Sequence, residues 1–380
     1  MKSKVVVLYC DTYDEDILCE KIQKGFELLG GTEKFFDKDE KILMKLNLVR
    51  GAAPERAVTT HPSVVSALAR VLYDSGYEKL SAGDSSGFGS PVRIMEDLGL
   101  KETFEKYNVR MADFKAGEKV AYPEGIHAKE FIISKDVIDT DALISVCKMK
   151  THALEYITGA VKNQYGCVQG LNKAKGHTVY PSQESFARML VDLNLCVKPR
   201  FYIMDGITAM EGNGPTSGDP TPMNVILMGA DPVAVDSVFC SLIGLLPENV
   251  PTNVYGKQMG LGTYVEDEIE ILTEDGEVSF SEAAERYGNP KFNVIRTKHT
   301  SRGIMGFVTR LNRFKRRPKI NGALCKKCGV CVEVCPVDGK AISFKNGRNE
   351  PPVYNYKKCI RCFCCQEMCP HKAIYVKGKN

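Results

Sequence analysis

The feature that most constrains this chain is a pair of matching cysteine runs near its C-terminal end. The two runs are Cys325-x2-Cys328-x2-Cys331-x3-Cys335-Pro336 and Cys359-x2-Cys362-x2-Cys365-x3-Cys369-Pro370. A cubane iron–sulfur cluster needs four thiolates at its corners, and a Cys-x2-Cys-x2-Cys turn can wrap three of them around one face. The fourth cysteine, followed by proline, ends each run. The sequence therefore predicts that this segment holds iron–sulfur clusters.

The two runs resemble those of bacterial two-cluster ferredoxins, in which the fourth cysteine of each run binds the other cluster. The resemblance implies one [4Fe-4S] cluster on Cys325, Cys328, Cys331 and Cys369. It implies a second [4Fe-4S] cluster on Cys359, Cys362, Cys365 and Cys335. Zinc is the alternative, because Cys-x2-Cys pairs also form zinc sites, but zinc does not require two four-cysteine runs with trailing prolines. Cys364 is a surplus thiol and is not assigned as a ligand.

The length and composition favour a large domain followed by a small one. The chain has 380 residues, of which 43% are apolar, enough for a sizeable core. Its apolar run Val5–Tyr9 is of strand length and is followed by acidic residues, so no signal peptide is expected. No apolar segment approaches the roughly 18 residues of a membrane span. Fifteen cysteines without a secretory signal favour a reducing compartment, so we predict a cytoplasmic protein.

The first 295 or so residues alternate between strand-like and helix-like patterns. Val5–Tyr9 is a buried-strand pattern, residues 16–29 have helical spacing, and Pro62 begins a second helix. Further strands are predicted at 41–49, 131–133, 142–146, 201–204, 225–228 and 268–272. This alternation is typical of an α/β fold with a mostly parallel sheet flanked by helices. The C-terminal cysteine segment is expected to form a small ferredoxin-like α+β domain.

Polar motifs fall near the predicted carboxyl ends of these strands, where ligands bind in such sheets. The motifs are Lys45-Leu46-Asn47, Gly83-Asp84-Ser85, Lys150-Thr151-His152, Thr158-Gly159-Ala160-Val161-Lys162-Asn163, Glu211-Gly212-Asn213-Gly214-Pro215 and Asp231-Pro232-Val233-Ala234-Val235-Asp236. In this order they resemble the family catalogued as domain of unknown function 362, over roughly residues 4–260. Members often carry a two-cluster ferredoxin segment, but the family implies no general reaction. A remoter, fold-level analogy is to the N-terminal half of nickel-pincer lactate racemases.

Residues 148–175 contain five lysines but only one acid, Glu155. If these loops converge, they create a field suited to a carboxylate or phosphate; the alternative is an ordinary solvated face. We predict Lys45, Asn47, Asp84, Ser85 and Asn163 as substrate-binding residues, and Lys150, Lys162 and His152 as catalytic residues. His152 is the expected proton donor, with a hydrogen-bonded structural role as its alternative. For Asp84 and Ser85, the alternative is a capping or turn role. Three further acids could be metal ligands or acid–base groups, with capping and turn roles as their alternatives: Asp205, Glu211 and Asp236.

Residues 298–319 carry eight Lys and Arg residues and no acid, although the whole chain has a formal charge of only +4. Apolar residues recur there at helical spacing, so we predict a basic amphipathic linker helix between residues 1–297 and the cluster domain at 320–380. The helix could dock on the large domain, attract an acidic electron carrier such as a ferredoxin or flavodoxin, or contact a membrane surface. No nucleic-acid-binding motif is present, and no nucleic-acid partner is expected.

The leading hypothesis is a ferredoxin-linked oxidoreductase. Its two [4Fe-4S] clusters would take electrons from a soluble carrier and reduce an anionic small molecule bound to the α/β domain. The sequence shows no flavin, nicotinamide or haem motif, so a further organic cofactor is left open. The alternatives are a non-enzymatic ferredoxin-type carrier, or an iron–sulfur sensor or assembly factor with an accessory docking domain.

Overall fold

The computed structural model describes residues 2–87, 89–170, 172–296 and 316–377. Its main feature is a ten-stranded sheet in the order β12-β11-β1-β10-β9-β7-β2-β3-β4, with β8 paired to the end of β7. The strands are β1 (Ser3–Tyr9), β2 (Ile42–Lys45), β3 (Leu80–Gly83), β4 (Val109–Ala112), β7 (Ala142–His152), β8 (Tyr156–Thr158), β9 (Phe201–Glu211), β10 (Asp219–Gly229), β11 (Ile269–Thr273) and β12 (Gly276–Val278). Strands β5 (Gly117–Ala121) and β6 (Glu130–Ser134) form a separate hairpin.

The sheet is mostly parallel, as the sequence predicts. Strands β4, β3, β2, β7 and β9 run parallel to one another, as do β1 and β11. Strand β10 is antiparallel to both of its neighbours, β9 and β1, while β8 and β12 are antiparallel hairpin partners. The mixed sheet confirms the α/β class, with β10 as an antiparallel insertion between the two parallel groups.

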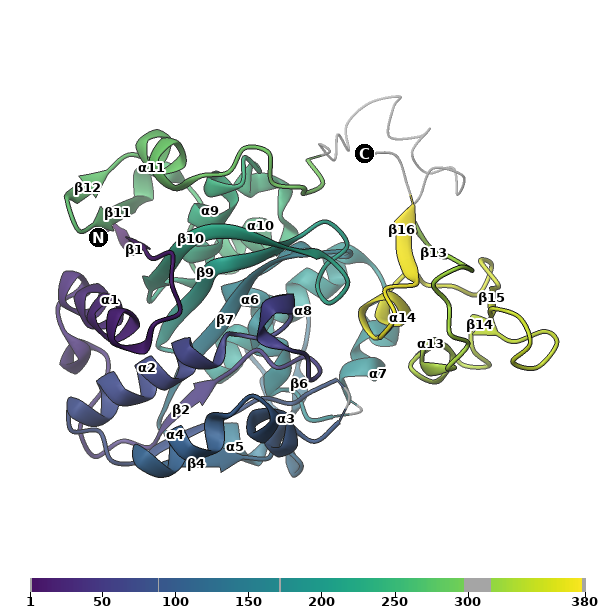
Figure 1. Cartoon of the computed structure of the whole chain (residues 1–380), viewed down its shortest axis with the longest axis horizontal. Helices are drawn as coiled ribbons and strands as arrows, with labels where there is room; N and C mark the ends of the chain where they lie inside the picture. The colour runs from purple at the N-terminus through teal and green to yellow at the C-terminus, as the bar shows by residue number, and fades with distance from the viewer. Residues whose placement is uncertain (1, 88, 171, 297–315, 378–380) are drawn as a thin grey trace.

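Helices cover both faces of the sheet. Side chains along a strand point alternately to the two faces, and in these strands both sets of side chains are apolar. In β1, Val6 and Leu8 belong to the core beneath α1 and α2, whereas Val5 and Val7 belong to the core beneath α9. The helices are α1 (Glu15–Leu29), α2 (Pro62–Asp74), α3 (Pro91–Asp97), α4 (Leu100–Lys106), α5 (Lys135–Ile138), α6 (Ala160–Asn163), α7 (Asn172–Val179), α8 (Gln183–Val197), α9 (Pro232–Leu242), α10 (Pro251–Gln258) and α11 (Phe280–Tyr287). Figure 1 shows α1 and α2 lying along one side of the strands.

Two helix starts agree with their sequence signals. His61 is the N-cap of α2, where its Nδ1 accepts a hydrogen bond from the Ser63 backbone at 3.2 Å. Asp231 caps α9 by accepting from the backbone of Val233 and Ala234 at 2.9 and 3.0 Å. Both helices have proline as their first residue, which already has the backbone angle that a helix requires.

The C-terminal part, residues 316–377, is a small α+β unit beside the carboxyl ends of the parallel strands (Figure 1). It contains the antiparallel pairs β13 (Arg317–Ile320) with β16 (Ile374–Lys377) and β14 (Ile342–Ser343) with β15 (Val353–Tyr354). Its short helices are α13 (Val330–Glu333) and α14 (Cys364–Glu367).

Most of the basic helix predicted at 298–319 lies outside the described residues. At its end, Arg317, Pro318 and Lys319 belong to strand β13, so the helix prediction is wrong for these positions. Pro318 explains the local result, since proline has no backbone N–H and suits an edge strand.

Candidate functional site

The last residue of β2, Lys45, is the centre of a buried polar network. Its Nζ lies 2.9 Å from Asp84 Oδ1 and donates to Asn163 Oδ1 at 3.2 Å and to the Leu46 carbonyl at 2.7 Å. Asn47 Nδ2 donates to the same Asn163 oxygen at 3.1 Å. A buried ammonium is stable only when its donors are satisfied and its charge is paired, and Lys45 meets both conditions. Lys45 and Asp84 therefore hold the ends of β2 and β3 together.

Lys150 lies beside this network but has no carboxylate partner among the described residues. Its Nζ donates to Asn47 Oδ1 at 2.6 Å and to the Val58 carbonyl at 2.7 Å. Burial, reinforced by the positive charges of Lys162 and Lys148, lowers the pKa of Lys150 to about 7. Lys150 is thus a buried base whose charge changes near neutral pH.

The segment from 147 to 152 is the end of the long strand β7 rather than a loop after it. Lys148 and Lys150 are two residues apart in β7, and their Nζ atoms reach different partners. Lys148 forms a 2.6 Å ion pair with Asp205, whose other oxygen accepts from the hydroxyl of Tyr13. Lys148 therefore belongs to a separate structural cluster.

Helix α6 brings Lys162 and Asn163 to the same edge. Asp236 holds the start of α6, because its two oxygens accept from the backbone of Ala160 at 2.6 Å and of Val161 at 3.1 Å. Burial raises the pKa of Asp236 to about 7. Asn163 Nδ2 donates to Ser145 Oγ at 2.9 Å, which fixes its oxygen toward Lys45 and Asn47. Asp236 is therefore a helix cap.

Gly166 follows α6 and closes over the Lys45–Asp84 pair. A Cβ at this position would lie 2.0 Å from Asp84 Oδ1 and 2.5 Å from Lys45 Nζ, so only glycine fits. Asp84 also accepts from the Leu48 backbone at 2.8 Å. Ser85 Oγ accepts from the Gly170 backbone at 3.0 Å, and its carbonyl accepts from Lys173 Nζ. Asp84 and Ser85 thus organise two loops around the site.

These residues surround a cavity of about 610 Å³ between the sheet edge and the C-terminal part. Its walls include all but one of the eight predicted substrate-binding and catalytic residues: Lys45, Asn47, Asp84, Ser85, Lys150, Lys162 and Asn163. The opposite wall contains Cys335, Lys340, Cys364, Glu367 and Met368. Residues distant in sequence therefore form one site. We call this space the main cavity.

His152 is the predicted site residue that lies outside the main cavity wall. Its Nδ1 accepts from the backbone of Leu154 at 3.1 Å and of Glu155 at 3.0 Å, so Nε2 carries the ring proton. Nε2 lies 2.8 Å from Glu367 Oε1. Burial lowers the pKa of His152 to about 4. His152 therefore reaches the main cavity only through Glu367, which lines it.

Two acids near these groups behave in opposite ways. Burial opposes ionisation of Glu367, yet His152 and the charge of Lys162 outweigh it and hold the pKa of Glu367 below its ordinary value. Glu155 is fully buried, and burial raises its pKa to about 8. Glu155 is therefore mostly protonated at neutral pH and does not neutralise the lysines around it.

Several main-cavity residues were not selected from the sequence. Lys173 and His177 line the wall from α7, Tyr165 lines it from the 3-10 turn Gln164–Cys167, and Glu367 lines it from α14. The excess of lysine over residues 148–175 was a signal for Lys173, whereas nothing in the pattern distinguished His177 or Glu367. Glu211 accepts from the Asn293 backbone at 2.8 Å and, like Asp205 and Asp236, does not line the main cavity.

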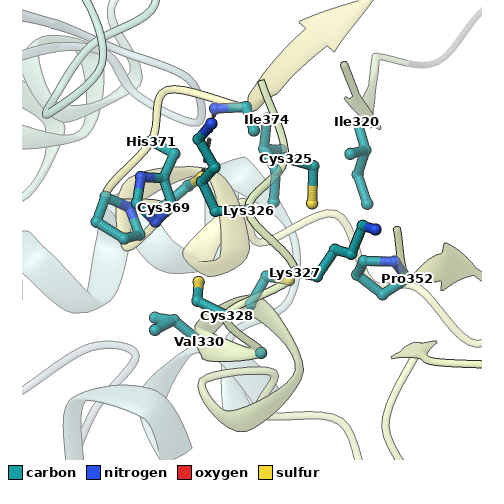
Figure 2. Close-up of a pocket in the computed structure, with 14 residues that line it drawn as sticks. Ile320, Cys325, Lys326, Lys327, Cys328, Val330, Pro352, Cys369, His371 and Ile374 are labelled. Atoms are coloured by element: carbon teal, nitrogen blue, oxygen red, sulfur yellow. Dashed lines mark hydrogen bonds between the residues drawn. The ribbon is translucent and has the colours of Figure 1, made fainter. Parts of the chain in front are cut away.

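The C-terminal part contains two hollows lined by cysteines. The first hollow contains Cys325, Cys328, Cys331 and Cys369, with apolar neighbours such as Ile320, Val330 and Ile374. Figure 2 shows Cys325, Cys328 and Cys369 around this space. The second hollow contains Cys335, Cys359, Cys362 and Cys365. Each hollow thus collects the four thiols predicted for one cluster, including the cysteine that crosses over from the other run.

This arrangement fits a thiolate-bound cubane better than a single ion. Within the described residues, no group of three or more His, Cys, Asp or Glu side chains is arranged to hold one metal ion. That result concerns a single ion and not a four-iron core, whose ligands surround a larger body. Cys364 lies outside both hollows and lines the main cavity instead.

The C-terminal part is fastened to the α/β part through α14. Gln366 is fully buried, and its Nε2 donates to the carbonyls of Asn213 and Gly214 at 2.9 and 3.0 Å. Lys372 Nζ donates to the Gly218 carbonyl at 3.0 Å. The Glu-Gly-Asn-Gly-Pro motif therefore contacts α14, the helix that contains the predicted ligand Cys365.

Comparison with known families agrees with both parts. Residues 42–241 match the family described as domain of unknown function 362. This chain belongs to that family. Residues 317–370 match a family described as a 4Fe-4S dicluster domain, so the chain is also an iron–sulfur protein.

A curated relative is a thylakoid-associated protein from Synechocystis. It is 32% identical over 262 residues, which cover 69% of this chain and 81% of the relative. Solved structures with some similarity are the lactate racemase apoprotein of Thermoanaerobacterium thermosaccharolyticum and a Thermotoga maritima protein. The first has 11% identity and a TM-score of 0.40, covering 61% of this chain and 56% of that chain. The second has 13% identity and a TM-score of 0.38, covering 60% and 59%.

In both structural matches, this chain spans less than two thirds of the other protein. In the parts of this chain that the structure describes, no helix is both long enough and apolar enough to cross a membrane.

Proposed function

We propose that the protein is a redox enzyme that uses two [4Fe-4S] clusters to reduce an anionic small molecule in the main cavity. When bound, the clusters supply single electrons to the site. The first hollow is the proposed point where electrons arrive from a soluble carrier such as a ferredoxin or flavodoxin. The second hollow is the proposed point where they leave for the substrate.

The observation that carries the proposal is a shared wall. Cys335 and Pro336 line both the second hollow and the main cavity. A molecule in the main cavity would therefore lie against a cysteine of the second group, without an intervening layer of protein. A simple electron carrier has no need of a cavity lined by lysines at this position, which favours an enzyme over the carrier alternative.

The charge of the main cavity indicates the class of substrate. Lys45 is neutralised by Asp84, but Lys150 and Lys162 have no carboxylate partner within hydrogen-bond distance among the described residues. Lys173 lines the same wall, and burial lowers its pKa to about 8. A volume of about 610 Å³ accommodates a metabolite or a small organic cofactor. We infer a carboxylate or phosphate compound as the ligand.

Each polar residue then has a role derived from its contacts. Asn47 and the Val58 carbonyl fix Lys150 Nζ, so its remaining N–H group can donate to the substrate anion. Because its pKa is near 7, Lys150 is also suited to donate a proton during a reduction. His152 positions Glu367 through its Nε2 proton, so we assign it a positioning role in place of direct proton donation.

Binding should weaken as the pH rises. Lys150 is protonated below its pKa of about 7 and loses its positive charge above it, so anion affinity should fall between about pH 6.5 and 8.5. Succinate is a suitable non-reducible probe. Its binding to the anaerobic, cluster-loaded protein can be followed by calorimetry and by the electron paramagnetic resonance of the reduced second cluster.

Lys150→Met is expected to weaken succinate binding roughly 10- to 100-fold and to flatten this pH dependence. Lys173→Gln should weaken it less, while Lys175→Gln is the matched control, because Lys175 is exposed in the same helix and outside the cavity wall. Succinate binding that is equal in the Lys150→Met and Lys175→Gln variants would contradict the proposed site. Saturable binding without any spectral change in either cluster would favour a non-enzymatic role.

We propose a cytoplasmic location, with membrane association as the alternative that the thylakoid-associated relative raises. The cysteine-rich composition supports a reducing compartment. Fractionation of cells followed by immunoblotting separates the two, because a peripheral protein remains with membranes at low salt and is released at high salt.

A further inference from the structure

A second cavity lies between the main cavity and the first hollow. It has a volume of about 260 Å³ and is lined by Arg50, Arg93, Ile94, Val330, Met368 and Pro370, among others. It shares Met368 with the main cavity and shares Val330 and Pro370 with the first hollow. Its position is therefore next to the cluster that the first hollow is predicted to hold, and separate from the predicted substrate residues.

The unusual group in this cavity is Arg50. Arg50 is only 9% exposed. Its Nε and Nη2 atoms are buried and have no hydrogen-bond partner in the part of the chain that the structure describes. These two nitrogens form the edge of a guanidinium whose N–H groups point in parallel, the geometry that binds the two oxygens of a carboxylate or phosphate. A buried cation with unsatisfied donors is costly, and because Arg50 lines this cavity, an anion bound there would supply the missing partner.

Among the described residues that line this cavity, no carboxylate pairs with Arg50. Arg93 lies in the same wall, and the one acid there, Asp97, is exposed and 4.0 Å from Arg93. The electrostatic neighbours of Arg50 are Arg56, which repels it, and Cys369, which attracts it. Cys369 is a predicted ligand of the first cluster. Arg50 is thus a positive charge shared between the cavity and that cluster.

We propose that this cavity binds a small oxyanion at Arg50 and that the bound anion lowers the reduction potential of the first cluster. The volume suits a phosphate-sized ion with a few waters and lies below the usual range for metabolite pockets, about 300–1,000 Å³. An unneutralised Arg50 stabilises the extra negative charge of a reduced cluster. An anion on Arg50 cancels that effect, so the cavity links anion concentration to electron uptake.

Inorganic phosphate is the probe, and the midpoint potential of each cluster is measured by redox titration with electron paramagnetic resonance. In the anaerobic, cluster-loaded wild-type protein, phosphate should lower the potential of the first cluster in a saturable manner. Arg50→Gln should lower that potential without phosphate and remove the response to it. Because phosphate can also enter the main cavity, the titration is repeated in Lys150→Met, where the response of the first cluster should persist.

Calorimetry gives an independent measure of the same site. Arg50→Lys keeps the charge but loses the parallel donors, so its phosphate dissociation constant should rise roughly 10- to 150-fold. Arg286→Gln, an exposed position in α11, is the control. If phosphate does not change the potential of the first cluster in the wild-type protein, only water fills the cavity and the proposal is overturned. A phosphate response that persists in both Arg50 variants would overturn the assignment to Arg50.

Because the Lys150→Met background retains this site, failure of the oxyanion site and failure of the proposed substrate site give different results. If the oxyanion site is wrong, phosphate will not change the potential of the first cluster. If the substrate site is wrong, succinate will not change the signal of the second cluster.

Discussion

The two cysteine hollows arise from nearly identical sequence runs but have different surroundings. In the first, Cys328 is exposed and Cys325 is half-buried. In the second, Cys335, Cys362 and Cys365 are buried, and Cys335 also borders the main cavity. The spacing of a motif thus specifies what it binds, whereas the rest of the chain specifies what the bound group can reach. This difference supports the proposed direction of electron flow from the first hollow to the second.

The largest expected effect comes from removing one ligand from each hollow. Cys331→Ala and Cys365→Ala should each reduce the iron content from about eight to about four per chain, measured by iron and sulfide analysis. Only Cys365→Ala should also weaken succinate binding strongly, because Cys365 lies in α14, which forms part of the main cavity wall.

Cys364→Ala provides the matched control for these variants. Cys364 is adjacent to Cys365 but lies outside both hollows, so its removal should leave the iron content unchanged. Iron loss in Cys364→Ala, or equal loss of succinate binding in the Cys331 and Cys365 variants, would contradict the comparison between the two hollows.

The interface beside the second hollow should make the protein sensitive to acid. His152 has a pKa of about 4 in the folded protein, below the ordinary histidine value of about 6.5 that applies to the unfolded chain. The unfolded chain therefore takes up a proton first as the pH falls, and the stabilisation present above about pH 6.5 is lost toward pH 4. Burial lowers the pKa of His61 and His177 to about 4 as well, so they contribute to the same loss.

His152→Gln should lower stability at pH 7.5 by about 1–3 kcal/mol, because Glu367 loses its buried partner. It should also reduce the further loss between pH 7.5 and 5, as measured by urea unfolding of the cluster-loaded protein. His127→Gln, at an exposed position, is the control. If wild type and His152→Gln lose the same stability on acidification, His152 does not contribute to the acid response.

Much of this architecture could be predicted because its signals are local. Strand β1 and helix α2 have clear periodicity and caps, and the spacing of the cysteine runs indicates an iron–sulfur segment, which the match to a 4Fe-4S dicluster domain supports. The polar motifs of β2, β3 and β7 could be placed together because parallel strands end at one edge of a sheet. The convergence of Lys45, Asp84 and Lys150 on the main cavity follows from topology alone.

The contacts between the two parts could not be predicted, because they depend on how α14 docks. Gln366 binds Asn213 across 153 positions of sequence, and nothing in either local pattern indicates the other. The pairing of His152 with Glu367 has the same origin, and it is the basis for our proposal that His152 positions Glu367 in place of donating a proton itself. No sequence motif distinguishes Arg50, because what sets it apart is that its Nε and Nη2 atoms have no hydrogen-bond partner among the described residues.

The smallest expected effect concerns the surface of the first hollow. Lys326 is exposed and lines this hollow together with Lys327 and His371, so the rim presents positive charge beside the exposed Cys328. An acidic ferredoxin or flavodoxin should be attracted to this rim. At low salt, Lys326→Gln should slow electron transfer from such a reduced carrier to the protein about two- to fivefold. Because the effect acts through long-range attraction between solvated charges, it should disappear near 0.5 M salt. Stopped-flow absorbance measures the rate, and Lys101→Gln, an exposed lysine in α4, is the control. If both substitutions slow the reaction equally, the attraction belongs to the whole surface and electrons do not enter specifically at the first hollow.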